Sequence, residues 1–331
     1  MFLHQTLALG HVTEPLYKLR VELHPLEAEL LASPSLRRLK HLHHYGASAL
    51  CTPVTHSRLE HTIGVWALTA RFFPDEPELR VAALLHDIGH LPFSHAAEKP
   101  LGLNHHRFTE ERIAGGDISP ILRKYGFDPQ RLIALLEQDT PLTGKRPQIG
   151  FDHLDSFLRD TEAAGTCRLA PSLIIGRLTA GSNGIETDEE TAGVIMDAVL
   201  ADHSQFLSAP MMAMDALLSK AVLLHAEAHP DWTRQLPGMT DFELLYVLQT
   251  SQVEQVRQLA HLLIWEPHRI RTSKEPFEGS IRVMPHKVYD NQPFVGGLAA
   301  SDILPGAAGA LESLRKLVSA HYIGWDPLPF A

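Results

Sequence analysis

The sequence predicts a mainly α-helical protein with small β-hairpins in its C-terminal half. Apolar residues recur at helical spacing over most of the chain, whereas strand-like alternation is confined to two short stretches. Helix start signals support this. The segment Ser57–Glu60 has the pattern of a capping box that opens a helix to about Phe73, and Pro77 follows Asp75 at the start of the next helix, which runs through Leu85.

The remaining helices are expected wherever apolar residues repeat every three or four positions. They are Leu26–His44 with an interruption at Ser33-Pro34, Phe108–Ala114, Pro129–Glu137, Phe151–Ala164, Glu189–Leu200, Met211–His229, Asp241–Leu248, Gln252–Trp265 and Ala307–His321, which precedes a Pro-rich tail.

Two hairpins are expected in the second half of the chain. The first joins a strand over Ser172–Thr179 to a strand over Ile185–Thr187 through the turn Gly181-Ser182-Asn183-Gly184. The second joins Arg269–Ser273 to Ser280–Tyr289, which both alternate apolar and polar residues.

No internal repeat or low-complexity segment divides the chain. The polar stretch Gln138–Gly150 has the composition of a loop inside a domain, because candidate site residues follow it immediately. We therefore expect residues 1–170 to form a core with an N-terminal helix, and residues 171–331 to form a helical region with small hairpins in the same globule.

Composition restricts the class of protein. The chain has 331 residues and a net charge of −10, which disfavours general nucleic-acid binding because phosphate backbones attract basic surfaces. Cys51 and Cys167 form no C-x-x-C pattern, so a reducing cytoplasm is expected. No apolar stretch approaches the length of a membrane span, and Met1–Gly10 lacks the features of a signal peptide.

A histidine and an aspartate end one of the apolar helices. The run Val81–Leu85 delivers His86 and Asp87 next to Gly89, which stops the helix. Burying an imidazole and a carboxylate is costly unless they are paired or bind a metal. Mixed nitrogen and oxygen ligands suit divalent ions such as Mn²⁺, Fe²⁺, Ni²⁺, Zn²⁺ or Mg²⁺.

The residues around this pair carry a family resemblance. The pattern His86-Asp87-x-Gly89-His90-x-Pro92-Phe93-Ser94-His95, preceded by Arg58-x-x-His61-x-x-Gly64-Val65, resembles the HD-domain superfamily of metal-dependent phosphohydrolases. In particular, it looks like the deoxynucleoside triphosphate triphosphohydrolase branch. The resemblance begins at Ser33–Leu39, includes Asp152–Asp160 and continues more weakly to Leu236–Asp241. It implies an HD-domain helical bundle.

The resemblance also implies a metal site. Its ligands would be His61, His86, Asp87 and Asp152, holding one divalent ion (Mn, Fe, Mg, Ni, Co or Zn). Such an ion acts as a Lewis acid and lowers the pKa of bound water.

Further residues match active-site positions of that family. The resemblance implies that His95 faces the scissile phosphate, that His105 serves in acid/base chemistry with Glu98 as its carboxylate partner, and that His90 is another active-site histidine. Arg58 would contact phosphate, where a guanidinium fork fits well.

Helical spacing places part of the fourth segment on one face. Asp152, Ser156 and Arg159 follow i, i+4, i+7 spacing with Asp160 beside them, so Leu154 and Asp155 are expected to point elsewhere. The resemblance implies that Asp160 approaches the substrate sugar.

The departures from the family pattern concern the substrate. His153 stands where the branch has Lys or Arg, Ser156 where it has Tyr, and His44 where it has Gln. The stretch Val199–Leu207 has neither the Arg nor the Tyr of the branch. Each lost charged hydrogen bond typically contributes about 1.5–3 kcal/mol, so triphosphate binding should weaken unless His153, Lys40 or Arg107 compensates.

We therefore expect a metal-dependent phosphohydrolase that acts on a nucleotide, similar to the dNTP enzymes but with an altered substrate pocket made by Arg58, His153, Ser156, Asp160 and His44. Three alternatives remain. They are a nucleoside monophosphate phosphatase, a two-metal phosphodiesterase or oxygenase that uses His90, His105 and His106, and a nucleotide sensor without turnover. A homo-oligomer without membrane contact is expected.

Overall fold

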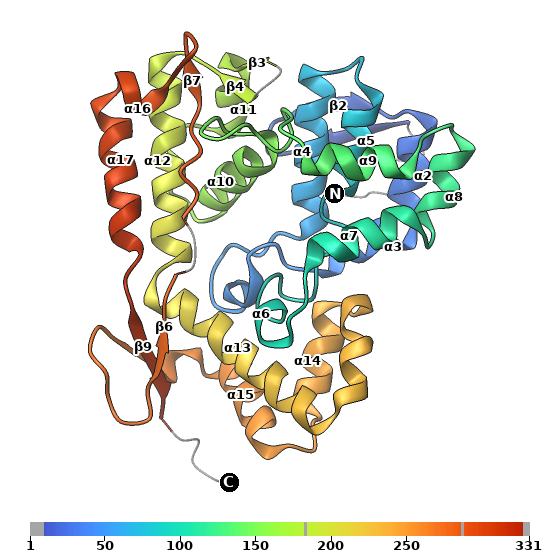
Figure 1. The fold of residues 1–331 in the computed structure, drawn as a ribbon. Helices are drawn as coiled ribbons and strands as arrows, with labels where there is room; N and C mark the ends of the chain where they lie inside the picture. The colour runs from blue at the N-terminus through green and yellow to red at the C-terminus, as the bar shows by residue number, and fades with distance from the viewer. Residues whose placement is uncertain (1–9, 182–183, 286–287, 327–331) are drawn as a thin grey trace.

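The computed structural model describes residues 10–181, 184–285 and 288–326, and it is mainly helical, as predicted (Figure 1). The first half contains the helices α2 (Pro25–Ala32), α3 (Pro34–Arg38), α4 (Arg58–Phe72), α5 (Pro77–Leu85), α6 (Glu98–Leu101), α7 (His105–Ala114), α8 (Ile118–Lys124), α9 (Pro129–Glu137) and α10 (Phe151–Ala163). The second half contains α11 (Pro171–Ile174), α12 (Glu189–Phe206), α13 (Ala209–Ala228), α14 (Asp241–Gln249), α15 (Glu254–Trp265), α16 (Ala300–Ile303) and α17 (Pro305–Leu317).

The capping box at the start of α4 is confirmed. The Ser57 hydroxyl accepts a hydrogen bond from the Glu60 amide at 3.3 Å, and Glu60 accepts from the Ser57 amide at 2.8 Å. This arrangement satisfies amides that the first helical turn leaves without partners. It fixes the start of the helix that carries Arg58 and His61.

Two apolar clusters make up most of the core. The first gathers side chains from α2 to α5 and from α7 to α10, together with α12. The second gathers α13, α14 and α15 (Figure 1), and it also takes in Leu91 and Phe93 from the loop after α5. The loop after the His86-Asp87 pair therefore leaves the first cluster and packs into the second.

Helices α4 and α10 approach closely because Gly64 has no side chain. A Cβ at this position would lie 2.0 Å from Asp155 Oδ1 and 2.2 Å from Arg159 Nη2. Any larger residue would push α10 away from α4. The glycine thereby allows polar groups of α10 to reach those of α4.

The strands form three small sheets. One is the antiparallel pair β1 (His11–Glu14) and β2 (Leu19–Glu22), which the sequence did not predict. The second has the order β3-β4-β7-β8, with β3 (Thr179–Gly181), β4 (Gly184–Glu186), β7 (Phe294–Val295) and β8 (Leu298–Ala299). The third has the order β5-β9-β6, with β5 (Ile270–Ser273), β9 (His321–Trp325) and β6 (Ile281–Val283).

The first predicted hairpin is partly confirmed. Strands β3 and β4 pair antiparallel, although the turn residues 182–183 lie outside the described part of the chain. The prediction of a strand over Ser172–Thr179 is wrong, because α11 and a 3-10 turn at Ile175–Arg177 occupy most of it. Ile174 and Ile175 are buried there from a helical turn, and a short apolar run cannot distinguish the two structures.

The second predicted hairpin is also wrong in its pairing. β5 and β6 do not pair with each other, because β9 inserts between them and pairs antiparallel with both. The helix predicted over Ala307–His321 ends at Leu317, so His321 begins β9 instead. Residues 286–287 of the predicted strand, the first nine residues and the tail 327–331 lie outside the described residues.

Within the described part of the chain, no single helix has the length and hydropathy of a membrane span. Only α12 and α13 taken together reach them, and the axis bends by 53° between the two.

Candidate functional site

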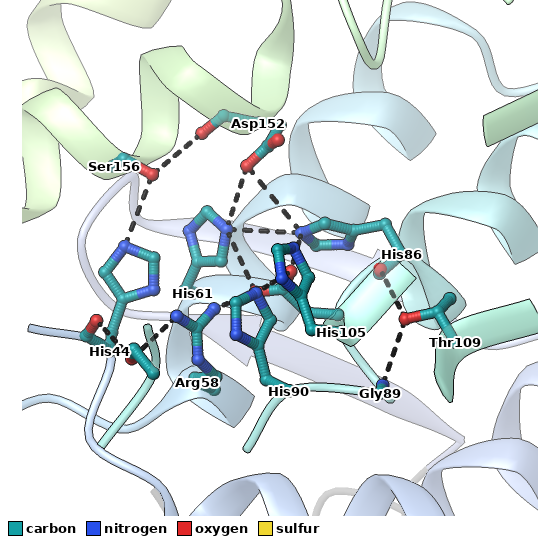
Figure 2. A network of polar contacts seen from close by, with 12 residues as sticks. His44, Arg58, His61, His86, Gly89, His90, His105, Thr109, Asp152 and Ser156 are labelled. Carbon is teal, nitrogen blue, oxygen red and sulfur yellow. Dashed lines mark hydrogen bonds and ion pairs between the residues drawn. The ribbon is translucent and has the colours of Figure 1, made fainter. Parts of the chain in front are cut away.

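The side chains of His61, His86 and Asp152 converge at one place between α4, the end of α5 and α10 (Figure 2), and Asp87 lies beside them. The Nε2 atom of His61 lies 3.2 Å from that of His86 and 3.2 Å from Asp152 Oδ1. Asp87 brings its Oδ2 to 3.8 Å from His61 Nε2 and its Oδ1 to 3.6 Å from His86 Nε2. Four candidate ligand residues from three helical segments thus lie close together.

The tautomers of the two histidines fit a metal at this point. His61 Nδ1 donates to Asp155 Oδ2 at 2.8 Å, and His86 Nδ1 donates to the carbonyl of Ala83 at 2.8 Å. With Nδ1 used as a donor, Nε2 of each ring is the nitrogen that coordinates a metal once it has given up any proton, and the two Nε2 atoms lie 3.2 Å apart. Such a contact is favourable when a cation lies between the atoms, so this donor set fits a divalent ion.

The electrostatics also favour a positive charge there. Burial acts to lower the pKa of His61, but hydrogen bonds with Asp152 and Asp155 outweigh it and raise that pKa to about 10. Burial acts to raise the pKa of Asp87, but the neighbouring His86 and His90 and the Arg58 guanidinium together lower it well below its usual range. The site therefore concentrates negative charge around the imidazoles.

Asp155 corrects a sequence expectation. It was expected to point away from the site, but it is fully buried and holds His61 through Nδ1. Arg159, which was expected on the face of Asp152, instead donates to both Asp155 oxygens at 2.9 Å and to Glu14 at 2.9 Å. The i, i+4 spacing from Asp155 to Arg159 was the signal that could have indicated this pair.

Arg58 is oriented by partners on both sides. It donates to Asp87 Oδ2 at 2.5 Å and to the Ser94 hydroxyl at 2.7 Å, while its Nε atom is buried without a hydrogen-bond partner. Ser94 and Phe93 both adopt left-handed backbone conformations, with φ of 58° and 52°. Asp241 of α14 holds this strained turn by accepting from the Phe93 amide at 2.7 Å.

Three predicted catalytic histidines form a second group with Glu98. Glu98 Oε1 accepts from His105 Nδ1 at 2.9 Å and from His95 Nδ1 at 3.2 Å. His90 stacks on His105 with ring centroids 4.0 Å apart, and its Nε2 lies 3.2 Å from Asp87 Oδ1. Burial acts to raise the pKa of Glu98, but these hydrogen bonds outweigh it and lower that pKa, so Glu98 acts as an ionised acceptor.

Gly89 allows α7 to bring His105 into this group. A Cβ at Gly89 would lie 2.1 Å from the Thr109 amide and 2.4 Å from the His105 carbonyl. The Gly89 amide instead donates to the Thr109 hydroxyl at 3.1 Å (Figure 2). The group formed by His90, His95, Glu98 and His105 also has the composition and spacing to hold a metal ion.

The site opens into a cavity of about 660 Å³. All predicted substrate-binding residues line it: Arg58, His44, His153, Ser156 and Asp160. Ser156 lies between His44 and Asp152, with its hydroxyl 3.3 Å from His44 Nε2 and 3.2 Å from the Asp152 carbonyl (Figure 2).

Sequence reasoning missed several residues of this cavity. Asp202 and Asp215 line it from α12 and α13, and Tyr289 lies with its ring 4.6 Å from that of His153. Tyr289 comes from a distant segment, so no local pattern indicated it. Asp202 stands inside the stretch Val199–Leu207, where only the absence of Arg and Tyr had been considered.

The basic residues considered as substitutes for lost phosphate contacts lie elsewhere, apart from His153. Lys40 pairs with Glu60, and Arg107 pairs with Glu111 on the surface with 77% of its side chain exposed. Among the described side chains, Arg58 is the one Lys or Arg that lines the cavity.

The comparisons with known proteins agree with this arrangement. Residues 58–143 match the HD domain family. The chain is 28% identical over 305 residues to the uncharacterized protein YdhJ of Bacillus subtilis, covering 89% of this chain and 90% of that protein. It is 26% identical over 251 residues to an uncharacterized protein of Methanocaldococcus jannaschii, covering 68% of this chain and 52% of that protein.

A relative with a named activity matches a shorter region. The human deoxynucleoside triphosphate triphosphohydrolase SAMHD1 is 27% identical over 154 residues, which are 38% of this chain and only 24% of the human protein. The chain therefore spans a minor part of that enzyme.

Solved structures share the fold. A phosphohydrolase from Bacteroides thetaiotaomicron superposes with a TM-score of 0.68 at 18% identity, covering 96% of this chain and all of that one. A hypothetical protein from Aquifex aeolicus gives 0.70 at 19% identity, covering 95% of both chains. Residues 58–143 are thus an HD domain, in a chain whose overall fold is shared with these two solved structures.

Proposed function

We propose that this protein is a metal-dependent phosphohydrolase that removes phosphate from a small ester of low charge, such as a nucleoside monophosphate. The observation that supports it most is the charge of the cavity. Arg58 is the one Lys or Arg among its described lining residues. A triphosphate carries several more negative charges than a monophosphate and needs more cationic groups.

A divalent ion held by His61, His86, Asp87 and Asp152 would supply Lewis acidity toward a phosphate oxygen. Arg58 would donate its remaining N–H groups to the phosphate, in an orientation fixed by Asp87 and Ser94. His105 donates its Nδ1 proton in a hydrogen bond to Glu98. Its Nε2 is therefore the atom that exchanges a proton with the leaving group or with water. His95 shares that carboxylate from a position with 58% of its side chain exposed.

The second candidate is a triphosphohydrolase, which the similarity to SAMHD1 favours. The two activities differ in their product. A monophosphatase releases inorganic phosphate from a nucleoside monophosphate, whereas a triphosphohydrolase releases inorganic triphosphate from a dNTP.

The test uses the full chain loaded separately with Mn²⁺, Co²⁺ or Mg²⁺ and given matched NMP, dNMP, NTP and dNTP panels. Phosphate and triphosphate are quantified separately by ion chromatography. We expect phosphate from monophosphates, and no activity after chelation. Triphosphate release from dNTPs as the faster reaction supports the second candidate instead, and no turnover with any combination contradicts both.

A further inference from the structure

A cluster of His44, His56 and Asp160 lies beside the candidate metal centre, and its residues His44 and Asp160 also line the cavity. Their ligand atoms lie within 4.8 Å of one another. We propose that this cluster is a second divalent-cation site, with Asp202 as its supporting carboxylate.

Backbone pairing brings the two histidines together. The His44 amide donates to the His56 carbonyl at 3.1 Å, and His43 and Ser57 form an antiparallel bridge beside them. The two rings therefore stack with centroids 5.2 Å apart. The turn before α4 thus supplies two imidazoles to one place, and α10 supplies Asp160.

The polar atoms of the cluster are buried without partners. Both ring nitrogens of His56, Nδ1 of His44 and Oδ1 of Asp160 are buried and have no hydrogen-bond partner. Asp160 has 7% and His56 10% of its side chain exposed, and His56 Nε2 lies 3.2 Å from Asp160 Oδ1 without hydrogen-bond geometry. Buried polar groups without partners are costly, so the cluster is arranged for a ligand that accepts lone pairs.

The donor atoms of the cluster favour a cation. Asp160 and Asp202 interact directly, and Asp202 Oδ1 is also buried without a partner. Arg159, the guanidinium adjacent in sequence, is already engaged by Asp155 and Glu14. Two carboxyl groups beside two imidazoles form a mixed oxygen and nitrogen donor set that suits a divalent cation.

Imidazole nitrogens and carboxylate oxygens are both ligands that divalent transition-metal ions accept. A neutral His56 keeps a lone pair available for coordination. Zn²⁺ is a suitable probe, because it binds mixed histidine and carboxylate sets in four-coordinate geometry.

The proposal is tested with Zn²⁺ on the full chain by two independent measurements. Anomalous diffraction at the zinc edge should show one peak at His61, His86, Asp87 and Asp152, and a second between His44, His56 and Asp160. After loosely bound metal has been removed, elemental analysis of His56→Gln should show one equivalent of zinc fewer than the unmodified chain. Asp202→Asn should lower the zinc affinity of the second site about 10- to 100-fold, as expected for a supporting carboxylate.

Matched variants separate the two sites. Asp87→Asn disrupts the first centre and should keep the second peak, so failure of the proposed function and failure of this site are distinguishable. His225→Gln changes a buried histidine of α13 that hydrogen-bonds Ser251, and it should retain both equivalents. Absence of a peak in the cluster while the first centre is full overturns the proposal, and so does an unchanged zinc content in folded His56→Gln. If His56→Gln does not fold, the diffraction experiment on the unmodified chain decides alone.

Discussion

The first side of the cavity, made by His61, His86, Asp87 and Asp152, differs from the second side, made by His44, His56, Asp160 and Asp202, in whether its buried polar atoms have hydrogen-bond partners. None of the four candidate metal ligands of the first centre keeps a buried side-chain atom without a partner, whereas His44, His56, Asp160 and Asp202 all do. On the first side, Asp155, the Ala83 carbonyl and Arg58 fix the ligands before any substrate arrives. The comparison teaches that protein contacts already orient the four candidate ligands of the first side, although Arg58 Nε and His90 Nδ1 beside them lack partners, whereas the proposed ligands of the second side are themselves left with unpartnered atoms.

The largest effect on activity is expected when a candidate metal ligand of the first side is removed. Asp87→Asn should lower kcat/KM by more than about 100-fold, since even supporting residues of metal sites contribute about 10- to 100-fold. Phosphate release and bound metal are measured together, with His225→Gln as the folded control. Full activity of a metal-depleted Asp87→Asn protein contradicts the assignment.

The next largest effect is expected at the supporting residue that sequence reasoning misplaced. Asp155→Asn keeps the shape of the side chain but weakens the contact that orients His61, so metal affinity should fall about 10- to 100-fold. Metal titration followed by activity measurement at saturating metal separates weakened binding from lost chemistry. An unchanged affinity indicates that Asp155 serves only Arg159 and the packing of α10.

A smaller effect is expected when a positive charge is placed at residue 153, where the resembling enzymes have Lys or Arg. His153→Lys adds a full positive charge to the cavity wall, and we expect tighter dNTP binding by about tenfold, because one charged hydrogen bond contributes about 1.5–3 kcal/mol. Competition against a monophosphate substrate gives the affinity. The variant His153→Gln adds no charge and should show no gain, and an equal gain in both variants excludes the electrostatic explanation.

An effect on stability is expected from Asp215, where burial raises the pKa to about 6 although Asp215 accepts from the Ala47 amide at 3.0 Å. A carboxyl with a raised folded pKa stabilises the fold below about pH 4, and that contribution is lost as pH rises toward 6. The free energy of unfolding should therefore fall by about 2–3 kcal/mol over this range, and Asp215→Asn should remove that slope. Urea unfolding at pH 4.5 and pH 7 measures it, and identical slopes in both proteins contradict the expectation.

The smallest effect is expected outside the cavity. Arg107→Ala changes an exposed residue whose partner is Glu111. The activation free energy calculated from kcat/KM and the free energy of unfolding should therefore each change by less than about 0.5 kcal/mol. A large loss of activity on triphosphates alone means that Arg107 reaches the substrate after all.

Much of the first side could be predicted from the sequence because its residues lie in short motifs on helices. The spacing of Arg58 to His61 and the run from His86 to His95 determine local geometry, and local geometry follows from propensity, caps and glycine positions. The same reasoning failed for Asp155, because helical faces are broad and only the neighbour α4 decides which residues at i and i+3 both point inward.

The strand pairing and the second side were decided by tertiary structure. β9 separates β5 from β6 through contacts some 50 residues apart, at Ser273 and Tyr322, which no local pattern specifies. Likewise, Asp202 and Tyr289 reach the cavity from α12 and from the segment before β7. The sequence by itself determined a helical HD domain with its candidate metal ligands, because those features depend on local spacing. The charge of the substrate cavity and the cluster around His56 depended on packing between distant segments, and the tertiary structure decided them.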